Sequence, residues 1–260
     1  MIVWGPGFRA AAHNHHSVQL LLALHGSLLV REGQKKPWRK CGAVWIQTDA
    51  IHEVDARGTT LVILFVNAES DMGAALSDRI KGGIACVPSR EVNRWRGVLG
   101  FTPDDTRAET WVTQFLPRPK SPVAIHPGVR RVLSHLHGPQ AMLSNLSLKR
   151  LAEIAGLSPS RFMHAFTESV RVPVRPYILW LRLQQAACEL RNGASITDAA
   201  YRAGFSDAAH LTRTFRRMLG ATPSDLALLR RLTLGFSIET NEDDRASQSS
   251  GQRPSQILCQ

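Results

Sequence analysis

Three histidines stand close together near the start of the chain, at His13, His15 and His16. Alternate residues of a β-strand point to the same side, so His13 and His15 can face one interior together. Imidazole nitrogens bind divalent transition metals, and they also hydrogen-bond small organic ligands. The spacing therefore predicts a ligand-binding position at the start of the fold, and it leaves a metal and an organic ligand both open.

Cysteine is scarce and scattered, with Cys41, Cys86, Cys188 and Cys259 as its only occurrences. These four residues form neither a CxxC pair nor a Cys/His spacing typical of a zinc finger. Widely spaced cysteines in a chain of 260 residues also do not indicate a disulfide framework. We therefore expect small buried thiols, or a loose thiol in the tail, in a reducing cytoplasm.

Hydropathy limits the possible classes further. Hydrophobic residues make up 43% of the chain, enough for sizeable cores. No stretch approaches the roughly 18 apolar residues that cross a membrane. Residues 1–12 lack a basic segment followed by an apolar run, so no secretory signal is predicted. A cytoplasmic protein of two domains, without contact to a membrane, is expected.

Positive charge is concentrated in the second half of the chain. The formal net charge is +11, and residues 129–236 contribute 15 Lys and Arg against 6 Asp and Glu. Residues 1–128 contribute 15 against 11, and residues 237–260 contribute 2 against 4. An excess of basic residues in one region favours a polyanionic partner such as nucleic acid.

Short apolar runs separated by turn residues fill the first part of the chain. They cover residues 18–24, 27–30, 43–46 and 60–66, and each has strand length with β-branched or aromatic content. Such runs at regular spacing predict an all-β sandwich or barrel. Residues 70–99 have a helical or mixed pattern instead, and we expect helices flanking the strands.

A proline-rich segment divides the chain. Residues 116–128 hold four prolines and a glycine, which indicates a linker between a domain at 1–115 and one at 129–236. The pattern beyond the linker is helical up to about residue 234. The Ser- and Gln-rich tail, 237–260, is predicted to be disordered.

An internal repeat is the most informative feature of the helical region. Residues 147–158 and 195–206 align at a constant offset of 48 residues. Both copies begin with a serine suited to an N-cap, and both carry a glycine where a tight turn between helices needs positive φ. Each copy therefore predicts a helix, a glycine-containing turn and a second helix.

The second helix of each copy has an apolar pair at i,i+4, which is Phe162/Phe166 in one copy and Leu211/Phe215 in the other. Ser158 and Ser206 are the expected N-caps, and the second copy has one extra residue at this point. Residues 177–190 form an uninterrupted helical pattern between the copies. A helix there can hold two recognition helices about one DNA turn, ~34 Å, apart.

Residues 129–230 resemble the DNA-binding domain of AraC-type transcriptional regulators. The most specific stretch is 203–223, from Ala-Gly-Phe-Ser-Asp to the Gly-Ala-Thr-Pro ending, and the Pro-Tyr-Ile-Leu-Trp-Leu-Arg-Leu run at 176–183 is also typical. One departure is Arg171, which stands where the first unit often carries a helix-stopping glycine. The resemblance implies an all-α domain with two helix-turn-helix units.

The resemblance also implies roles on the two recognition helices. Arg213 is the foremost candidate for reading a base, because a guanidinium can bind guanine O6 and N7 together. A phosphate contact by Arg213 stays open as an alternative. The residues that match base-facing positions are Ser160, Met163, His164, Ala209, Thr212 and Arg213. The residues expected to contact phosphates are Ser206, Arg216 and Arg217.

The N-terminal histidines resemble part of the cupin pattern. Cupin metalloenzymes hold a metal with three His and one Glu inside a barrel, whereas Gln19, a weaker ligand, occupies the Glu position here. Sensor domains of AraC-type regulators are also cupin-like, which implies an N-terminal all-β barrel. We predict an effector pocket at His13, His15, Gln19 and His52, with no cofactor; a bound metal and a purely structural role remain alternatives.

The leading functional prediction is an effector-responsive transcriptional regulator, expected to dimerise, to bind double-stranded promoter DNA and to contact RNA polymerase as activators do. Residues 71–99 are the expected dimerisation segment. One alternative is a cupin metal-dependent enzyme with a helical appendage, which Gln19 disfavours. Another is an alkyl-transfer DNA-repair protein, which would need an activated cysteine in a suitable context. We therefore predict that the chain is not an enzyme.

Overall fold

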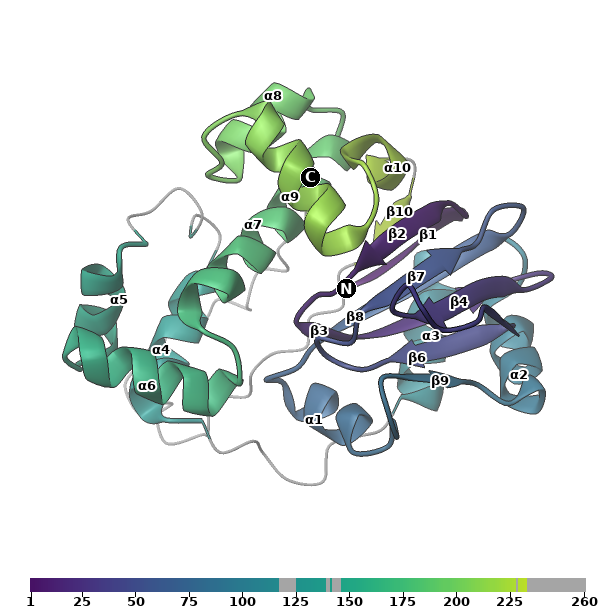
Figure 1. Cartoon of the computed structure of the whole chain (residues 1–260), viewed down its shortest axis with the longest axis horizontal. Coiled ribbons are helices and arrows are strands. Elements are labelled where there is room, and N and C mark those ends of the chain that lie inside the picture. Colours follow the sequence, from purple (N-terminus) through teal and green to yellow (C-terminus); the bar gives the residue numbers. More distant parts are fainter. Residues whose placement is uncertain (117–124, 139–140, 142–145, 228, 233–260) are drawn as a thin grey trace.

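A computed structural model describes residues 1–116, 125–138, 141, 146–227 and 229–232. The chain forms an N-terminal region of β-sheets with flanking helices and a C-terminal region of helices (Figure 1). The residues predicted as the centre of the linker, 117–124, and as the disordered tail, 237–260, lie outside the described part. No helix within the described part is long and apolar enough to cross a bilayer.

The larger sheet is antiparallel and has six strands. Its central strands, β3 and β8, are the apolar runs predicted from the sequence, and side chains on both of their faces are buried. The order across the sheet is β10 (Arg230–Leu232), β1 (Ile2–Pro6), β8 (Thr60–Asn67), β3 (Ser17–Ala23), β6 (Ala43–Ile46) and β9 (Ile84–Cys86).

The smaller sheet is antiparallel and has four strands. Its order is β2 (Arg9–His13), β7 (His52–Asp55), β4 (Leu28–Glu32) and β5 (Arg39–Cys41). Val30 and Val54 of this sheet and Leu21 and Ile63 of the larger one share a single buried core. The prediction of a β domain is confirmed as two antiparallel sheets, and their closure into a cupin-like barrel stays a prediction.

Helices cover the outer face of the larger sheet. They are α1 (Asp71–Ser77), α2 (Ser89–Leu99) and α3 (Asp105–Phe115). Trp95 of α2 and Trp111 of α3 are buried against Leu20, Leu22 and Leu64 in a second core. Because the larger sheet is covered on both faces, its central strands are mostly apolar and buried on both sides instead of alternating.

The C-terminal region is built around one long helix, α7 (Val174–Arg191). Helices α5 (Leu148–Ala155) and α6 (Pro159–Val170) form the first predicted unit. Helices α8 (Ile196–Arg202) and α9 (Ala208–Leu219) form the second. Helices α4 (Pro127–Leu136) and α10 (Pro223–Ala227) complete the region, so both units are where the repeat predicts them.

The prediction of helix up to residue 234 is wrong at its end. Residues 230–232 form strand β10, which returns to the N-terminal sheet and pairs antiparallel with β1. Without β10, β1 would be an edge strand with unpaired backbone groups, and pairing removes that edge. The C-terminal region is therefore not all-α within the described residues, and it closes onto the first strand of the chain.

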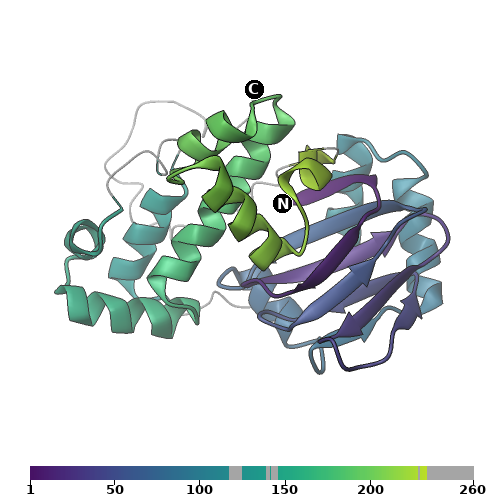
Figure 2. The ribbon, with the colours of Figure 1, turned by 45° about the horizontal axis from the view of Figure 1, so that its top comes forward.

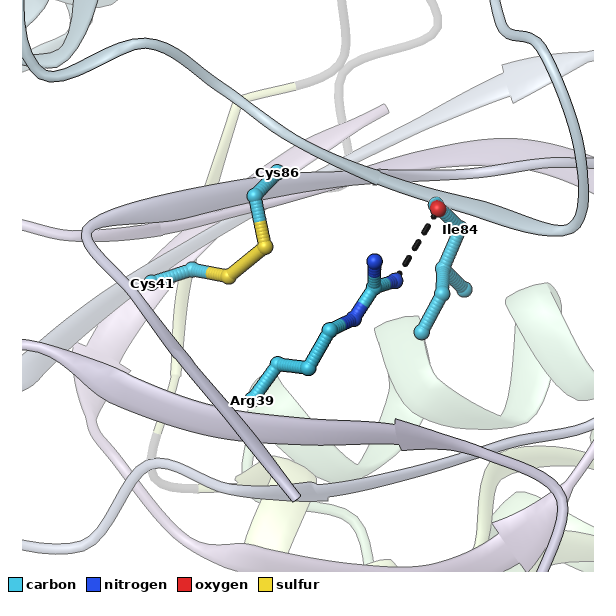
Figure 3. Close-up of a disulfide and its surroundings, with 4 residues drawn as sticks. All are labelled: Arg39, Cys41, Ile84 and Cys86. Atoms are coloured by element: carbon cyan, nitrogen blue, oxygen red, sulfur yellow. Dashed lines mark hydrogen bonds between the residues drawn. A yellow bond between two sulfur atoms is a disulfide. The ribbon is translucent and has the colours of Figure 1, made fainter. Parts of the chain in front are cut away.

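The expectation of unpaired thiols is also wrong, because none of the cysteines that the structure describes, Cys41, Cys86 and Cys188, is free. Cys41 and Cys86 form a disulfide, with Arg39 donating a hydrogen bond to the carbonyl of Ile84 beside it (Figure 3). They are 45 residues apart in sequence, and the sheets bring their Cα atoms to 5.9 Å. Because strand pairing brings together residues far apart in sequence, the spacing of the cysteines could not predict this bond. The wide spacing of the cysteines is therefore no evidence for a reducing compartment.

Candidate functional site

The first helix-turn-helix unit is specified by local residues. The hydroxyl of Ser147 accepts a hydrogen bond from the amide of Arg150 at the start of α5. Gly156 then takes a left-handed φ of 67°, as the turn requires, and Ser158 caps α6. The predicted caps and the predicted turn glycine of this unit are confirmed.

The second unit follows the same plan with one difference. Ser195 caps α8, and Gly204 has a φ of 75° in the turn. The N-cap of α9 is Asp207, whose carboxylate accepts from the amide of His210 at 2.6 Å, so the expectation of Ser206 at this position is wrong. The extra residue in this copy shifts the start of the helix by one position.

The two recognition helices, α6 and α9, bury one face and expose the other. Phe162 and Phe166 are buried on α6, and Leu211 and Phe215 are buried on α9. The predicted DNA-contacting residues lie on the other side. Ser160, Met163, His164, Ser206, Ala209, Arg213, Arg216 and Arg217 are exposed, and Thr212 is half-buried with its hydroxyl bonded to Ala208 O at 2.8 Å.

Helix α7 connects the two units. Its 18 residues make a rod of about 27 Å at 1.5 Å per residue, with the first unit packed near its start and the second near its end (Figure 1). The first recognition helix ends at Val170, because Arg171 adopts a left-handed φ of 65° as its C-cap. Arg171 thus occupies a backbone conformation that favours glycine, and the departure noted in the sequence is a real one.

A second candidate site lies in the β region, where three predicted effector residues converge. His13 and His52 are directly paired across strands β2 and β7, and His15 follows β2. One ring nitrogen from each lies within 4.8 Å of the others, and all three side chains are buried. The prediction that these residues meet in one interior place agrees with the geometry.

Hydrogen bonds hold each ring of this His13/His15/His52 cluster by its Nδ1 atom. Nδ1 of His13 donates to Ala11 O at 2.7 Å, and Nδ1 of His52 donates to Ala50 O at 2.9 Å. A carbonyl can only accept, so the proton is on Nδ1 and Nε2 keeps a lone pair when these rings are neutral. Nδ1 of His15 pairs with the hydroxyl of Ser17 at 2.9 Å.

Burial keeps the cluster uncharged at neutral pH. It lowers the pKa of His13 to about 4. Burial, with repulsion from His13, lowers the pKa of His15 to about 3. The pKa of His52 lies well below its ordinary value for the same reasons. The site therefore offers neutral imidazoles, the form in which histidine donates lone pairs to a ligand.

Polar atoms in the cluster lack partners in the fold. Nε2 of His15, Nε2 of His52 and Oε1 of Gln19 are buried and make no hydrogen bond. Gln19 lines the same cavity as His13 and His52, together with Leu219 from the end of α9. Buried polar atoms without partners are costly, so these side chains are candidates for contact with a ligand.

The helical region closes over this cluster. The indole of Trp180 in α7 stacks on His15, with ring centres 5.5 Å apart. The amide of Ala11 in β2 donates to the carbonyl of Gly220, the C-cap of α9, at 2.8 Å. The second recognition helix thus rests against the strand that carries His13, and Figure 2 shows the yellow-green end of the helical region against the purple first strands.

Two further polar links join the β region to the end of α6 and the start of α7. Nε2 of His16 donates to Val170 O, the last residue of α6, and its Nδ1 pairs with Asp49, both at 3.0 Å. Although burial opposes it, the bond to Asp49 raises the pKa of His16. The hydroxyl of Tyr177 in α7 donates to the buried carboxylate of Glu69. Sequence reasoning missed these contacts, because nothing in the local patterns links residues so far apart.

Comparison with known proteins agrees with this geometry. The helix-turn-helix domain family matches residues 151–228. An uncharacterized HTH-type transcriptional regulator of Staphylococcus aureus is 38% identical over 80 residues, 30% of this chain and 11% of that protein. The HTH-type transcriptional activator RhaS of Escherichia coli is 35% identical over 79 residues, and the match covers 23% of its length. The chain therefore spans a minor part of these relatives.

Solved structures share the arrangement of both regions. The apo form of a single-residue variant of ToxT from Vibrio cholerae matches with a TM-score of 0.55 at 10% identity, over 87% of this chain and 96% of that one. Wild-type ToxT with a bound unsaturated fatty acid matches with a TM-score of 0.52 at 11% identity, over 88% and 95%. This likeness concerns the fold: a β-sheet domain followed by a helical one.

The sequence matches and the geometry together define the class. The helical region is a helix-turn-helix domain, in agreement with the helix-turn-helix units predicted from the sequence. The chain combines this domain with an N-terminal domain of two antiparallel sheets, as ToxT does.

Proposed function

We propose that this protein is a sequence-specific DNA-binding transcriptional regulator whose affinity for promoter DNA responds to an effector in the β domain. The observation that carries the proposal is the pair of recognition helices, α6 and α9, which expose equivalent faces near the two ends of α7. The excess of basic residues in this half supplies attraction to the phosphate backbone. The AraC class is non-enzymatic, which argues against the metalloenzyme and DNA-repair alternatives.

Contacts on the recognition helices divide into two kinds. Ser160, Met163 and His164 on α6, with Ala209, Thr212 and Arg213 on α9, face the bases of two successive major-groove segments. Ser206, Arg216 and Arg217 hold phosphates and set the register. Because the hydroxyl of Thr212 is bonded within the helix, Thr212 contributes its methyl group, which suits contact with a thymine methyl.

The effector site consists of His13, His15, Gln19 and His52. It is supported by three unpartnered buried polar atoms and by the proximity of α9 and α7. An occupant there touches the elements that orient the second recognition helix, so it changes DNA affinity. The proposal also includes dimerisation through residues 71–99 and contact with RNA polymerase. The outer surface of α2 is exposed and can take part in dimerisation.

A second cavity favours another class of effector. It lies between the β domain and α7, with walls formed mostly by Val3, Phe65, Leu183 and Leu229 and with Arg191 at its margin. An apolar cavity with a guanidinium suits an amphipathic carboxylate, and one ToxT structure of this fold holds an unsaturated fatty acid. Titration of long-chain carboxylates with tryptophan fluorescence of Trp180 tests this candidate, and an unchanged signal would exclude it.

The central experiment is selection of bound sequences from fragmented genomic DNA, followed by affinity measurement at several salt concentrations. We expect an enriched motif with two half-sites about one helical turn apart. Arg213→Ala should relax selectivity at one base pair by about 1–3 kcal/mol. Lys35→Ala, an exposed basic residue between β4 and β5, is the control and should change nothing. Binding without any sequence preference would refute the proposal.

A further inference from the structure

A disulfide ties the two sheets together at one end, and the helical region holds them at the other. Strand β9 is the edge strand of the larger sheet and β5 is the edge strand of the smaller one, and the Cys41–Cys86 bond joins them. At the opposite ends, β10 pairs with β1, and Gly220 O at the end of α9 accepts from the amide of Ala11 in β2. The core between the sheets therefore lies between a covalent bond and the second recognition helix.

The residues at the bond belong to the same core as the second recognition helix. Cys41 and Ile84 pack in the cluster that also contains Leu211 and Phe215 of α9. Bonded sulfur atoms lie about 2.0 Å apart, and reduction moves them to a nonbonded distance. Because close-packed interiors transmit small displacements, opening of the bond disturbs a core on which α9 depends.

One side of the bond is within reach of a reductant. Cys86 is exposed on β9, which is only three residues long, whereas Cys41 is 6% exposed. Thiol–disulfide exchange begins with attack of a thiolate on a sulfur atom that it can reach. We therefore expect attack on Sγ of Cys86, with Cys41 as the leaving group.

Positive charge around Cys41 favours its departure. Arg39 and Lys40 directly precede Cys41 and are exposed, and the guanidinium of Arg39 lies beside the bond, where it donates to Ile84 O (Figure 3). Neighbouring Lys and Arg side chains stabilise a thiolate, and a more stable thiolate leaves faster in exchange. The surroundings of this disulfide therefore suit exchange as well as structural support.

We infer that the Cys41–Cys86 bond is a reversible redox switch that a dithiol reductant opens, and that its opening weakens binding to promoter DNA. This inference adds a form of regulation to the proposed function, on which it rests. One thiolate of the dithiol attacks Cys86 and forms a mixed disulfide, and Cys41 leaves as a thiolate that takes up a proton. The second thiol then closes the disulfide of the reductant and releases Cys86, so two electrons and two protons pass to the protein.

The reduced protein keeps its fold but loses order in the shared core. Strand β9 retains its antiparallel pairing with β6, from Val44 opposite Cys86 to Ile46 opposite Ile84. The bond spans 45 residues, so its loss gives the unfolded chain more freedom and lowers thermal stability. A more mobile core leaves α9 less ordered, and DNA binding must then supply the free energy that orders this helix.

The test uses two full-length variants that each keep one pair of cysteines. Cys188→Ala/Cys259→Ala keeps only Cys41 and Cys86, and Cys41→Ala/Cys86→Ala removes them. Each variant is equilibrated under native conditions with set ratios of reduced to oxidised dithiothreitol, and alkylation of free thiols with mass spectrometry gives the reduced fraction. In the first variant we expect complete, reversible reduction with unchanged circular dichroism and a melting temperature about 5–15 °C lower.

Affinity for the selected DNA is then measured by fluorescence anisotropy in both redox states. Reduction of Cys188→Ala/Cys259→Ala should weaken binding about fivefold or more, and reoxidation should restore it. Cys41→Ala/Cys86→Ala should bind with the weaker affinity whether or not dithiothreitol is present. Hydrogen exchange in the reduced first variant should accelerate in β5, β9 and α9 and stay unchanged in α5 and α6, which belong to a separate core.

The outcomes separate this inference from the proposed function. A bond that opens only in denaturant would overturn the switch. Reversible opening with unchanged or tighter DNA binding would also overturn it and leave the proposed regulator intact. Reversible opening in a protein without any sequence preference would overturn the proposed function instead. If Cys41→Ala/Cys86→Ala folds poorly, the first variant decides by itself, because its two redox states are compared within one sequence.

Discussion

The two helix-turn-helix units share a sequence plan but differ in what surrounds them. The first unit packs its buried side chains, Phe162 and Phe166 among them, into a core formed with α4 and the first half of α7. The second unit buries Leu211 and Phe215 in a core that continues into the space between the two β-sheets. The first unit is thus attached to the β domain by a few polar contacts, and the second is part of its core.

Because of this difference, we expect the two recognition helices to respond differently to changes in the β domain. A recognition helix that shares a core with the β domain moves when that core is repacked, because close-packed interiors transmit small displacements. The first recognition helix, held by His16 and the Tyr177–Glu69 bond, can keep its position on DNA independently. We therefore expect an effector to act mainly on the half-site read by α9.

The largest expected effect follows loss of Trp180, which is fully buried between the β domain and the second unit. Trp180→Ala should lower the free energy of unfolding by about 3–5 kcal/mol, from lost burial and the cavity left behind. Urea denaturation measures this loss. Tyr201→Ala, 78% exposed on α8, is the control and should change it by less than about 0.5 kcal/mol.

Trp180→Ala and Phe162→Ala, which lies in the first unit, together test whether the two units belong to separate cores. Hydrogen exchange should accelerate in both the β domain and the second unit after Trp180→Ala, because they share one core. After Phe162→Ala, faster exchange should be confined to α4, α5, α6 and the first half of α7. If hydrogen exchange accelerated in the same helices and strands after both substitutions, the two cores would not be distinct.

Tyr177→Phe should have the next largest effect. It removes the hydroxyl that donates to the buried carboxylate of Glu69 and accepts from Nε2 of His137, so a buried acceptor loses its donor. The expected loss is about 1.5–3 kcal/mol in the free energy of unfolding. In Glu69→Gln the further cost of Tyr177→Phe should be smaller, which a double-mutant cycle measures; additive effects would deny the interaction.

Gly220→Ala tests the contact between α9 and β2. Gly220 has a φ of 63°, and an added Cβ would lie 2.2 Å from Ala11 O. Gly193, with a φ of 88°, has no atom within 4 Å of such a Cβ, so Gly193→Ala measures the backbone cost alone. Gly220→Ala should cost about 1–3 kcal/mol more than this control in thermal or urea unfolding. Equal costs would mean that α9 is not tightly docked.

The smallest expected effect is a gain in stability at the end of the first recognition helix. Arg171 holds a left-handed φ of 65°, which costs a residue with a Cβ about 1 kcal/mol relative to glycine. Arg171→Gly should therefore raise the free energy of unfolding by up to about 1 kcal/mol. Arg175→Gly, on the exposed side of the first turn of α7, should lower it instead and serves as the opposite-sign control.

Local sequence decided the elements of both units. Serine caps at 147, 158 and 195 and glycines at 156 and 204 act within one turn of their own position, and side-chain hydrogen bonds and φ preferences are short-range effects. The same holds for the apolar runs that became β3, β6 and β8, since their patterns reflect burial on the sheet. Only the shift of one N-cap from Ser206 to Asp207 escaped this reasoning.

The contacts that join segments far apart in sequence were decided by the tertiary structure alone. The Cys41–Cys86 bond, the return of β10 to β1 and the docking of Gly220 on Ala11 join residues whose separation in sequence carries no periodic signal. The histidine cluster stands between these cases: alternation in the sequence placed His13 and His15 on one side, whereas strand pairing brought His52 to them. Chain segments far apart meet only when a shared core forms, so these contacts depend on packing of the whole fold rather than on any local preference.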